Sequence, residues 1–198
     1  MRNFMRTAIL ALPLFIPTVG WTRAGELLSL QPESKLWVEG KSSIKDWSCK
    51  ATDVNAVVEA ASANAVPQLL TGDKAVKNVN VTLSSEKMDC GNGTMNEHMR
   101  KALKTSEFST INFRVNSYDL TRKPEGISGT MTGVLTLGGV KKPVTIEATG
   151  TEEKGALHVL GSYDLKMTDY DLTPPSLMFG RIKVRELVTV KFDLLLKN

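Results

Sequence analysis

The sequence feature that most restricts the fold is a repeated two-residue alternation of apolar and polar side chains. Such alternation places every second side chain on one face of an extended strand, so that one face is buried and the other is solvated. Ile111, Phe113 and Val115 alternate in this way with polar neighbours. Similar segments begin near residues 36, 54, 78, 127, 144, 157 and 188. About eight strands are therefore expected, and the fold class is predicted to be all-β.

Short connections that are rich in turn residues join the middle strands. They are "TRKPEG" at 121–126, "GGVKK" at 138–142 and "TEEKGA" at 151–156. Short loops join antiparallel neighbours, and such a sheet either closes into a barrel or splits into two packed sheets. We favour an eight-stranded antiparallel barrel, because Gly129, Gly133 and Gly161 lie on apolar faces, where they would permit bending or leave interior space. Periodicity alone leaves the sandwich as a competitor.

One segment, "TMNEHMRKALKTSEF" beginning at Thr94, has helical periodicity instead. Thr94 and Glu97 have the spacing of a capping box, in which their side chains satisfy amide groups at the helix start. Met95, Met99 and Leu103 then form one apolar face. A single amphipathic helix beside a barrel must bury that face, and the barrel end is the natural place. We therefore predict one short helix that forms a lid with these three residues.

The first 24 residues have the features of a secretory signal peptide. Arg2 and Arg6 precede an apolar run, and Ala24 is a small residue at a plausible cleavage site. The run is too short, and too interrupted by proline, for a membrane span. We expect residues 1–24 to be removed, and residues 25–198 to form one domain that is periplasmic or secreted and does not span a membrane.

The charge of the mature chain is nearly balanced. Three of the 25 basic residues lie in the predicted signal segment, which leaves 22 basic against 21 acidic side chains. No basic stripe with interleaved aromatic residues remains, so nucleic acid is not an expected partner. Arg181, Lys183 and Arg185 occupy alternate positions and are interpreted as the solvent face of a strand.

Cys49 and Cys90 are the only cysteines of the chain. Exported proteins usually meet an oxidising compartment, which favours a structural disulfide between the two. It would close a loop of about 40 residues. Neither cysteine has the CxxC spacing of a redox centre or zinc site, so a structural role is favoured over a catalytic one.

The sequence offers little catalytic machinery. His98 and His158 are the only histidines, and isolated histidines of this kind are interpreted as surface residues. Asp169 and Asp171 resemble the start of a cation loop, but the glycine and glutamate of an EF-hand do not follow. The sequence also shows no nucleophile elbow and no phosphate-binding glycine loop. We predict no catalytic residue, no metal site and no cofactor.

The inward-facing apolar residues form the candidate ligand site. An eight-stranded barrel is near the size at which side chains either fill the interior or leave room for one small ligand. Inward glycines and flexible methionines favour the cavity over the filled core. The expected lining is Phe113, Val115, Ile127, Met131, Leu135, Leu157, Val159, Tyr163, Leu165, Val190, Phe192 and Leu194. Tyr163 would also offer a hydroxyl to a polar head group.

An ordered series of segments resembles a known family. The segments are "MNEHMRKALKTSEFSTINFRV", "GTMTGVLTLGGVKKPVTIEATG", "GSYDLKMTDYDLTPP" and "VTVKFDLLLK". The series resembles the YceI-like family of bacterial exported proteins, most specifically from Gly133 to Gly150. The resemblance implies a lipocalin-like barrel with an extended apolar interior, which binds a polyisoprenoid or another amphiphilic lipid. It carries over no catalytic motif, and the lining residues above rest on the alternation alone.

Two functions of different classes follow. The first is an exported non-enzymatic binding protein that encloses an amphiphilic lipid, such as a polyisoprenoid or isoprenoid quinone, for transport, storage or sequestration. The second is a stress-related periplasmic interaction protein with a packed core, whose partner binds the apolar loop from Thr168 to Glu186 around Met178 and Phe179. An enzyme is the weakest alternative. Exposed apolar loops are compatible with a homodimer, although nothing in the sequence requires one.

Overall fold

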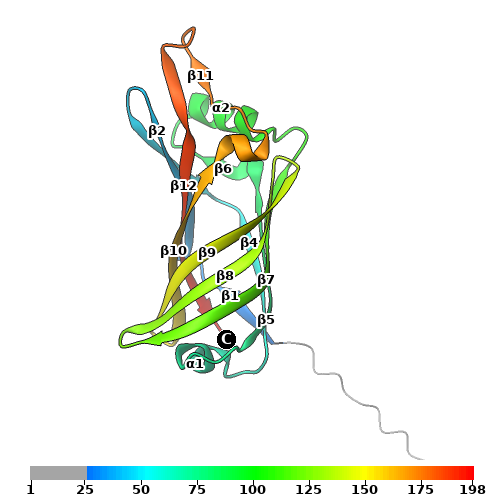
Figure 1. Cartoon of the computed structure of the whole chain (residues 1–198), viewed down its shortest axis with the longest axis vertical. Helices are drawn as coiled ribbons and strands as arrows, with labels where there is room; N and C mark the ends of the chain where they lie inside the picture. Colours follow the sequence, from blue (N-terminus) through cyan, green and yellow to red (C-terminus); the bar gives the residue numbers. More distant parts are fainter. Residues whose placement is uncertain (1–25) are drawn as a thin grey trace, which may run out of the picture.

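The computed structural model describes residues 26–198, which form a tall β-barrel with a short helix at each end (Figure 1). The predicted signal segment, residues 1–24, lies outside the described residues. The first strands are β1 (Glu26–Leu30), β2 (Lys35–Ser42), β3 (Asp46–Ala51), β4 (Val54–Ala60), β5 (Val76–Ser84) and β6 (Met88–Asp89). The later strands are β7 (Thr110–Lys123), β8 (Gly126–Leu137), β9 (Val140–Glu153), β10 (Ala156–Lys166), β11 (Ser176–Leu177) and β12 (Ile182–Lys197). The helices are α1 (Ala65–Leu70), α2 (Gly93–Leu103) and the 3-10 turns η1 (Ser85–Lys87) and η2 (Met167–Tyr170).

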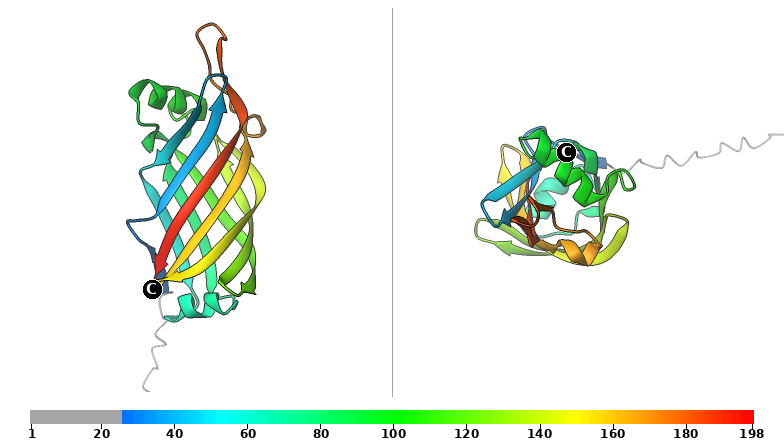
Figure 2. Two further views of the ribbon diagram at one scale, coloured as in Figure 1. Left: turned by 90° about the vertical axis from the view of Figure 1, so that its left-hand side faces the viewer. Right: turned by 90° about the horizontal axis from the view of Figure 1, so that it is seen from above.

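The sheet closes on itself through the long strand β12. One edge of β12 pairs with β10 along most of its length, and the other edge pairs first with β2 and then with β1. The closing seam between β1 and β12 consists of two residue pairs, Ser29 with Lys197 and Leu30 with Leu196. The segments β1–β2 and β3–β4 each act as one interrupted barrel strand, and every pairing is antiparallel. The predicted eight-stranded antiparallel barrel is confirmed, and the sandwich is excluded (Figure 2).

Helix α1 closes one end of the barrel, and the sequence analysis missed it. With six residues, one of them Pro67, it is too short to show a helical period. Ala65, Val66 and Leu69 are buried in a core cluster with the strand residue Leu28. Both ends of the barrel are therefore covered, where the sequence predicted one cover.

Helix α2 covers the other end, but the capping box predicted at its start is wrong. The N-cap is Asn92, whose extended backbone lets Oδ1 accept a hydrogen bond of 3.2 Å from the Met95 amide. Thr94 therefore lies inside the first helical turn instead of before it. The helix ends at Leu103, and Lys104 follows in the left-handed conformation with φ of 55°.

The predicted disulfide between Cys49 and Cys90 is confirmed. It joins the fully buried Cys49 of β3 to the segment that leads into α2. The Asn96 side chain of α2 holds the same segment, because its Oδ1 accepts a hydrogen bond of 2.7 Å from the Cys90 amide. The cross-link therefore fixes α2 to the barrel wall.

Aromatic rings occupy the space beside two of the three inward glycines. A methyl group added at Gly161 would overlap the ring of Phe192, its direct partner on β12, and one added at Gly133 would overlap the ring of Phe113. The interpretation that these glycines leave empty space is wrong at both positions, because each one lets a phenyl ring lie flat against the sheet. Gly129, in contrast, borders the cavity described below.

Replacing Gly161 with alanine is expected to lower the free energy of unfolding by about 1–3 kcal/mol, because the new methyl group must displace the Phe192 ring. The matched control is Gly129→Ala, whose methyl group would lie 3.1 Å from the flexible end of Leu120. Urea denaturation should show a neutral or slightly stabilising effect for the control. Phe192→Leu should recover part of the stability in the Gly161→Ala background, because the Glu147 carbonyl, 2.8 Å from the added methyl group, remains. Equal losses for the two alanine variants would contradict the explanation.

Candidate functional site: an apolar cavity inside the barrel

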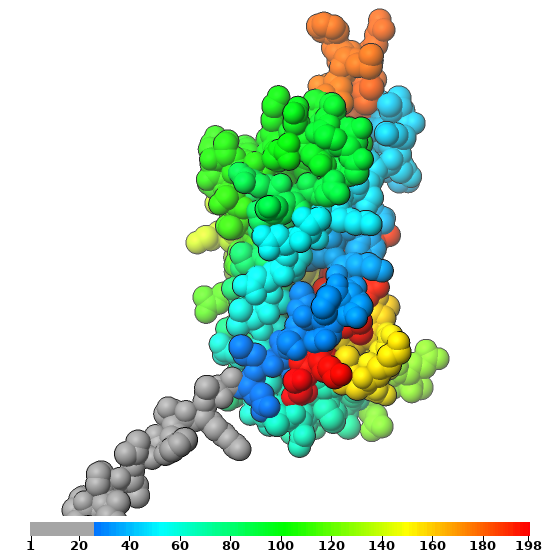
Figure 3. All heavy atoms as spheres, turned by 180° about the vertical axis from the view of Figure 1, so that it is seen from behind, coloured from blue at the N-terminus to red at the C-terminus, as the bar shows by residue number. Residues whose placement is uncertain are grey.

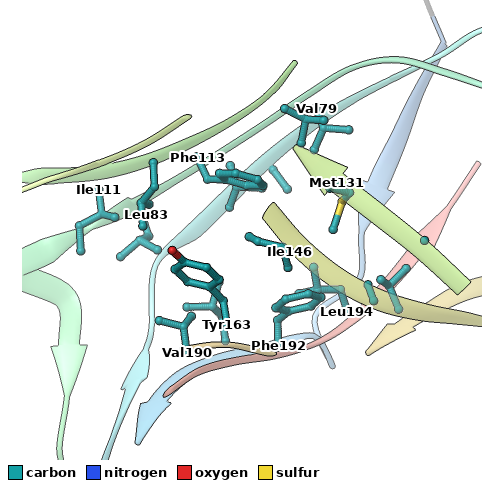
Figure 4. Close-up of a pocket in the computed structure, with 18 of the residues that line it drawn as sticks. Val79, Leu83, Ile111, Phe113, Met131, Ile146, Tyr163, Val190, Phe192 and Leu194 are labelled. Carbon is teal, nitrogen blue, oxygen red and sulfur yellow. The ribbon is translucent and has the colours of Figure 1, made fainter. Parts of the chain in front are cut away.

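A cavity of about 310 Å³ lies inside the barrel, within the size range of ligand pockets (Figure 4). Its lining extends from Leu28 and Leu69 near α1 to Met99 and Leu103 of α2. Packed clusters stand at both ends, one around α1 and one around α2 and η2. Side chains do not completely fill the interior between the two clusters, and this middle section is called the waist of the cavity.

All twelve residues predicted from the alternation lie in the wall of this cavity. Ile127, Leu157, Leu165 and Phe192 are buried. The other eight are half-buried although they point inward, because they border unfilled space instead of packed atoms: Phe113, Val115, Met131, Leu135, Val159, Tyr163, Val190 and Leu194. The geometry agrees with the lining expected from the sequence, and contact with a ligand stays a prediction.

The predicted lid is brought together only in part. Met99 and Leu103 border the cavity, whereas Met95 does not. Met95 lies in the first turn of α2 and is half-buried away from the lining. The end cover is completed by η2 and the two residues after it, where Met167, Tyr170 and Leu172 are buried in the same cluster as Leu103.

Sequence reasoning missed the lining residues Tyr118 and Leu120 because a β-bulge interrupts β7. Val115 pairs with Gly133 but Ser117 pairs with Thr132, so one extra residue stands in β7. Before the bulge odd-numbered residues face inward, and after it even-numbered ones do. The strands of the first half contribute further lining residues outside the predicted set. They include Leu36, Val38, Trp47, Ala56, Val58, Val79, Val81 and Leu83, and Val79, Val81 and Leu83 already showed the alternation that would have placed them.

Besides Thr149, the side chains of Tyr118, Tyr163 and Trp47 bring polar atoms to the cavity wall. The Tyr118 hydroxyl is tied to β5, since it donates to the Val76 carbonyl at 3.0 Å and accepts from the Val76 amide at 2.9 Å. The Tyr163 hydroxyl has no hydrogen-bond partner among the described residues and points toward Leu83 and Ile111 (Figure 4). Trp47 Nε1 is buried away from the open space of the cavity and likewise has no partner within residues 26–198. The Tyr163 hydroxyl is therefore the donor that a ligand in the cavity can reach.

The two tyrosines near the α2 end stay protonated at neutral pH. Burial, with a smaller effect of Asp169, raises the pKa of Tyr163. Burial also raises the pKa of Tyr170 to about 12, with smaller contributions from Tyr163 and Asp169. Each tyrosine therefore keeps its hydroxyl proton, and Tyr163 can donate it to an acceptor in the cavity.

The histidines and the "DYD" segment lie apart from the cavity. His158 is half-buried on the outer face, with Nε2 2.8 Å from Asp193 Oδ1 and Nδ1 3.2 Å from Glu153 Oε2. His98 lies half-buried on α2, and between Asp169 and Asp171 the side chain of Tyr170 is buried. Within residues 26–198 no group of three or more His, Cys, Asp or Glu side chains has metal-binding geometry.

The loop from Thr168 to Glu186 has two parts with different environments. Its first part folds over the barrel end, where Tyr170 and Leu172 are buried. Its second part forms a projecting hairpin of β11 and the start of β12 (Figure 1). Met178 and Phe179 at its tip are exposed, with Phe179 fully accessible to solvent.

No helix in the described part of the chain has the length and apolar character needed to cross a membrane.

Comparison with solved structures shows the same fold. Burkholderia cenocepacia BcnA superimposes with a TM-score of 0.67 at 17% identity, over 84% of this chain and 99% of its own. A Saccharophagus degradans domain described as polyisoprenoid binding, and implicated in plant cell wall breakdown, gives 0.58 at 12% identity, over 86% and 97%. The Campylobacter jejuni YCEI protein gives 0.55 at 16% identity, over 76% and 84%.

Sequence comparison gives a more specific relationship. The proteins named YceI from Salmonella arizonae and Salmonella newport are 39% identical over 72 residues, which is 35% of this chain. The match spans 36% of the length of those relatives. The YceI-like domain family matches residues 34–196, and thus nearly the whole barrel. The chain therefore belongs to the YceI-like family.

Proposed function

We propose that this protein is an exported, non-enzymatic carrier that encloses the apolar tail of an amphiphilic lipid, such as a polyisoprenoid or an isoprenoid quinone. The observation that carries the proposal is the cavity of about 310 Å³ with its almost wholly apolar wall. Burial of a hydrocarbon tail there is favourable by about 25 cal/mol per Å² of apolar surface, with few directional bonds needed. The polyisoprenoid-binding description of the Saccharophagus degradans domain supports the same ligand class.

The Tyr163 hydroxyl would orient a bound lipid. Tyr163 packs against the core cluster at the α2 end, whereas the cluster at the α1 end contributes apolar residues such as Leu28 and Ile127. A lipid with an oxygen at one end would place that oxygen near Tyr163 Oη. Its tail would extend through the waist toward α1.

The proposal also covers the export of the chain and its division into a signal peptide and one domain. Residues 1–24 would be the signal peptide, and residues 25–198 one lipid-binding domain in the periplasm or outside the cell. Transport, storage and sequestration of the lipid all use the same cavity. A homodimer is compatible with this function but adds nothing to the site.

The alternative function, an interaction protein with a packed interior, loses its structural premise because the interior holds a cavity. One observation still favours a partner on the outer surface, namely the exposure of Met178 and Phe179. That observation is taken up in the next subsection.

Native mass spectrometry of protein purified from its own host, followed by denaturing lipid extraction, tests the carrier function. The expected result is a mass above that of the polypeptide, and an extracted lipid with a long apolar chain. Protein stripped of lipid should then take up an added polyprenol or isoprenoid quinone at one molecule per chain. A homogeneous unliganded mass, with no uptake of either class, would refute the proposal.

A further inference from the structure

At the α2 end the β11–β12 hairpin projects beyond the rest of the molecule. The β2–β3 hairpin lies beside its base, at about the level of α2 (Figure 3). Their turns expose Ile44, Met178 and Phe179, with 64%, 63% and 111% of each residue accessible. These three residues are called the apolar tip. Their side chains form an apolar surface on two neighbouring turns that no described part of the fold covers.

The two hairpins are hydrogen-bonded to each other through Ser43. The Ser43 amide donates to the Lys183 carbonyl at 2.9 Å, and the Lys183 amide donates to Ser43 Oγ at 3.2 Å. Ser43 Oγ also lies 3.3 Å from the Arg181 carbonyl. The apolar residues of the two turns are therefore presented together by a fixed scaffold.

The backbone at the tip is strained by the side chains it carries. Met178 and Phe179 adopt φ of 51° and 55°, the left-handed region that asparagine and glycine occupy more readily than large apolar residues. Because Phe179 is fully accessible to solvent, its side chain makes no packing contact that would offset the strain of its backbone. Strained residues of this kind point to function.

Basic side chains surround the apolar tip. Residues 41–46 and 176–185 contain five exposed basic residues and one acidic residue, Asp46. The five are Lys41, Lys45, Arg181, Lys183 and Arg185. Because residues 25–198 carry 22 basic against 21 acidic side chains, these residues form a local excess of positive charge on a nearly balanced chain. Apolar residues on projecting turns with lysines and arginines behind them match the interface of an anionic bilayer, where apolar groups enter and cations meet lipid phosphates.

We propose that the apolar tip docks the α2 end of the barrel on the surface of an anionic phospholipid membrane. The tip is convex and narrow, so it suits a soft lipid surface better than a folded protein partner, which would need a matching pocket. The Tyr163 hydroxyl lies nearer to the docked end, so a lipid whose polar end binds it would direct that end toward the membrane. The docking itself does not depend on the proposed carrier function.

Flotation of the full mature chain with vesicles tests the proposal. At low salt the protein should float with vesicles of phosphatidylglycerol and phosphatidylethanolamine, and should remain unbound with phosphatidylcholine alone. Met178→Asn together with Phe179→Asn should weaken binding about 10-fold or more, because both side chains lose their insertion into the interface. Asparagine tolerates the left-handed backbone, so the variant is expected to fold at least as well.

Charge is tested separately by Arg181→Gln, Lys183→Gln and Arg185→Gln in one chain. The affinity should fall on the order of 100-fold, and added salt should weaken the wild-type binding in the same direction. The matched controls are Leu160→Ser on the outer wall of β10 and Arg122→Gln with Lys123→Gln at the opposite barrel end. Both controls should bind as the wild type does.

Three results would overturn the proposal. They are absence of wild-type binding to anionic vesicles, equal loss in tip and control variants, and equal binding to phosphatidylcholine. Lipid uptake from detergent micelles, which need no docking, reports on the cavity independently. Tip variants that take up lipid from micelles but fail to float with vesicles would support docking. If the wild type takes up no lipid from micelles, the carrier function is refuted and the docking proposal is unaffected.

Discussion

Replacing Met131 with tryptophan is expected to abolish lipid uptake while the barrel stays folded. Met131 is half-buried, and its side chain points into the waist of the cavity (Figure 4). An indole is larger than a thioether chain and would occupy the volume that a lipid tail needs. Uptake should fall at least about 10-fold in a fluorescent-lipid displacement assay, while the midpoint of thermal unfolding stays close to that of the wild type.

The matched control for this prediction is Thr132→Trp, one residue further along β8. Thr132 faces outward and is exposed, so it receives the same indole without changing the cavity. It should bind lipid as the wild type does. If Met131→Trp instead destabilises the fold by about 1–3 kcal/mol, the interior behaves as a packed core, and the cavity cannot be the binding site.

Removing the disulfide by Cys49→Ala with Cys90→Ala is expected to lower the free energy of unfolding by about 4 kcal/mol. The cysteines are 41 residues apart in sequence, and closing a loop of that size restricts the unfolded chain by about this amount in the chain-entropy model. The loop contains β4, α1 and β5, so cavity wall from two strands and one end cover lie within it. Denaturation in guanidinium should show the loss as a lower midpoint.

Chemically reduced wild-type protein separates the cross-link from the packing of the sulfur atoms. It keeps both side chains, one of which is the fully buried Cys49, but lacks the bond. Similar stabilities for the reduced protein and the double variant would show that the cross-link carries the effect. A free energy within about 1 kcal/mol of the oxidised wild type would contradict the loop-closure argument.

The barrel and about a third of the cavity lining could be predicted because a period of two is a local property of sequence. Leu157, Val159, Tyr163 and Leu165 alternate without interruption, and the structure places all four in the cavity wall. The eight-strand closure followed from the number of such segments. The short connections that contain Gly139 and Gly155 indicated antiparallel neighbours. Both glycines have positive φ in the structure.

What the sequence did not reveal depends on interruptions and on contacts between distant segments. The bulge after Val115 reverses which side chains point inward, and no periodic pattern marks it. The six residues of α1 form a helix because the barrel end buries them, since so short a helix is marginal alone. The N-cap at Asn92 was missed because a threonine two residues later offered an equally plausible capping box.

The barrel wall is expected to open most easily at the short seam between β1 and β12. Two residue pairs close it, and beside them the Gln31 amide donates to the Leu195 carbonyl at 2.8 Å. Local opening breaks the fewest hydrogen bonds at this place, so amide protons of β1 should exchange with solvent sooner than those of β8. A lipid tail that reaches the α1 end would therefore lie against the most yielding part of the wall, where the interior can widen for a longer chain.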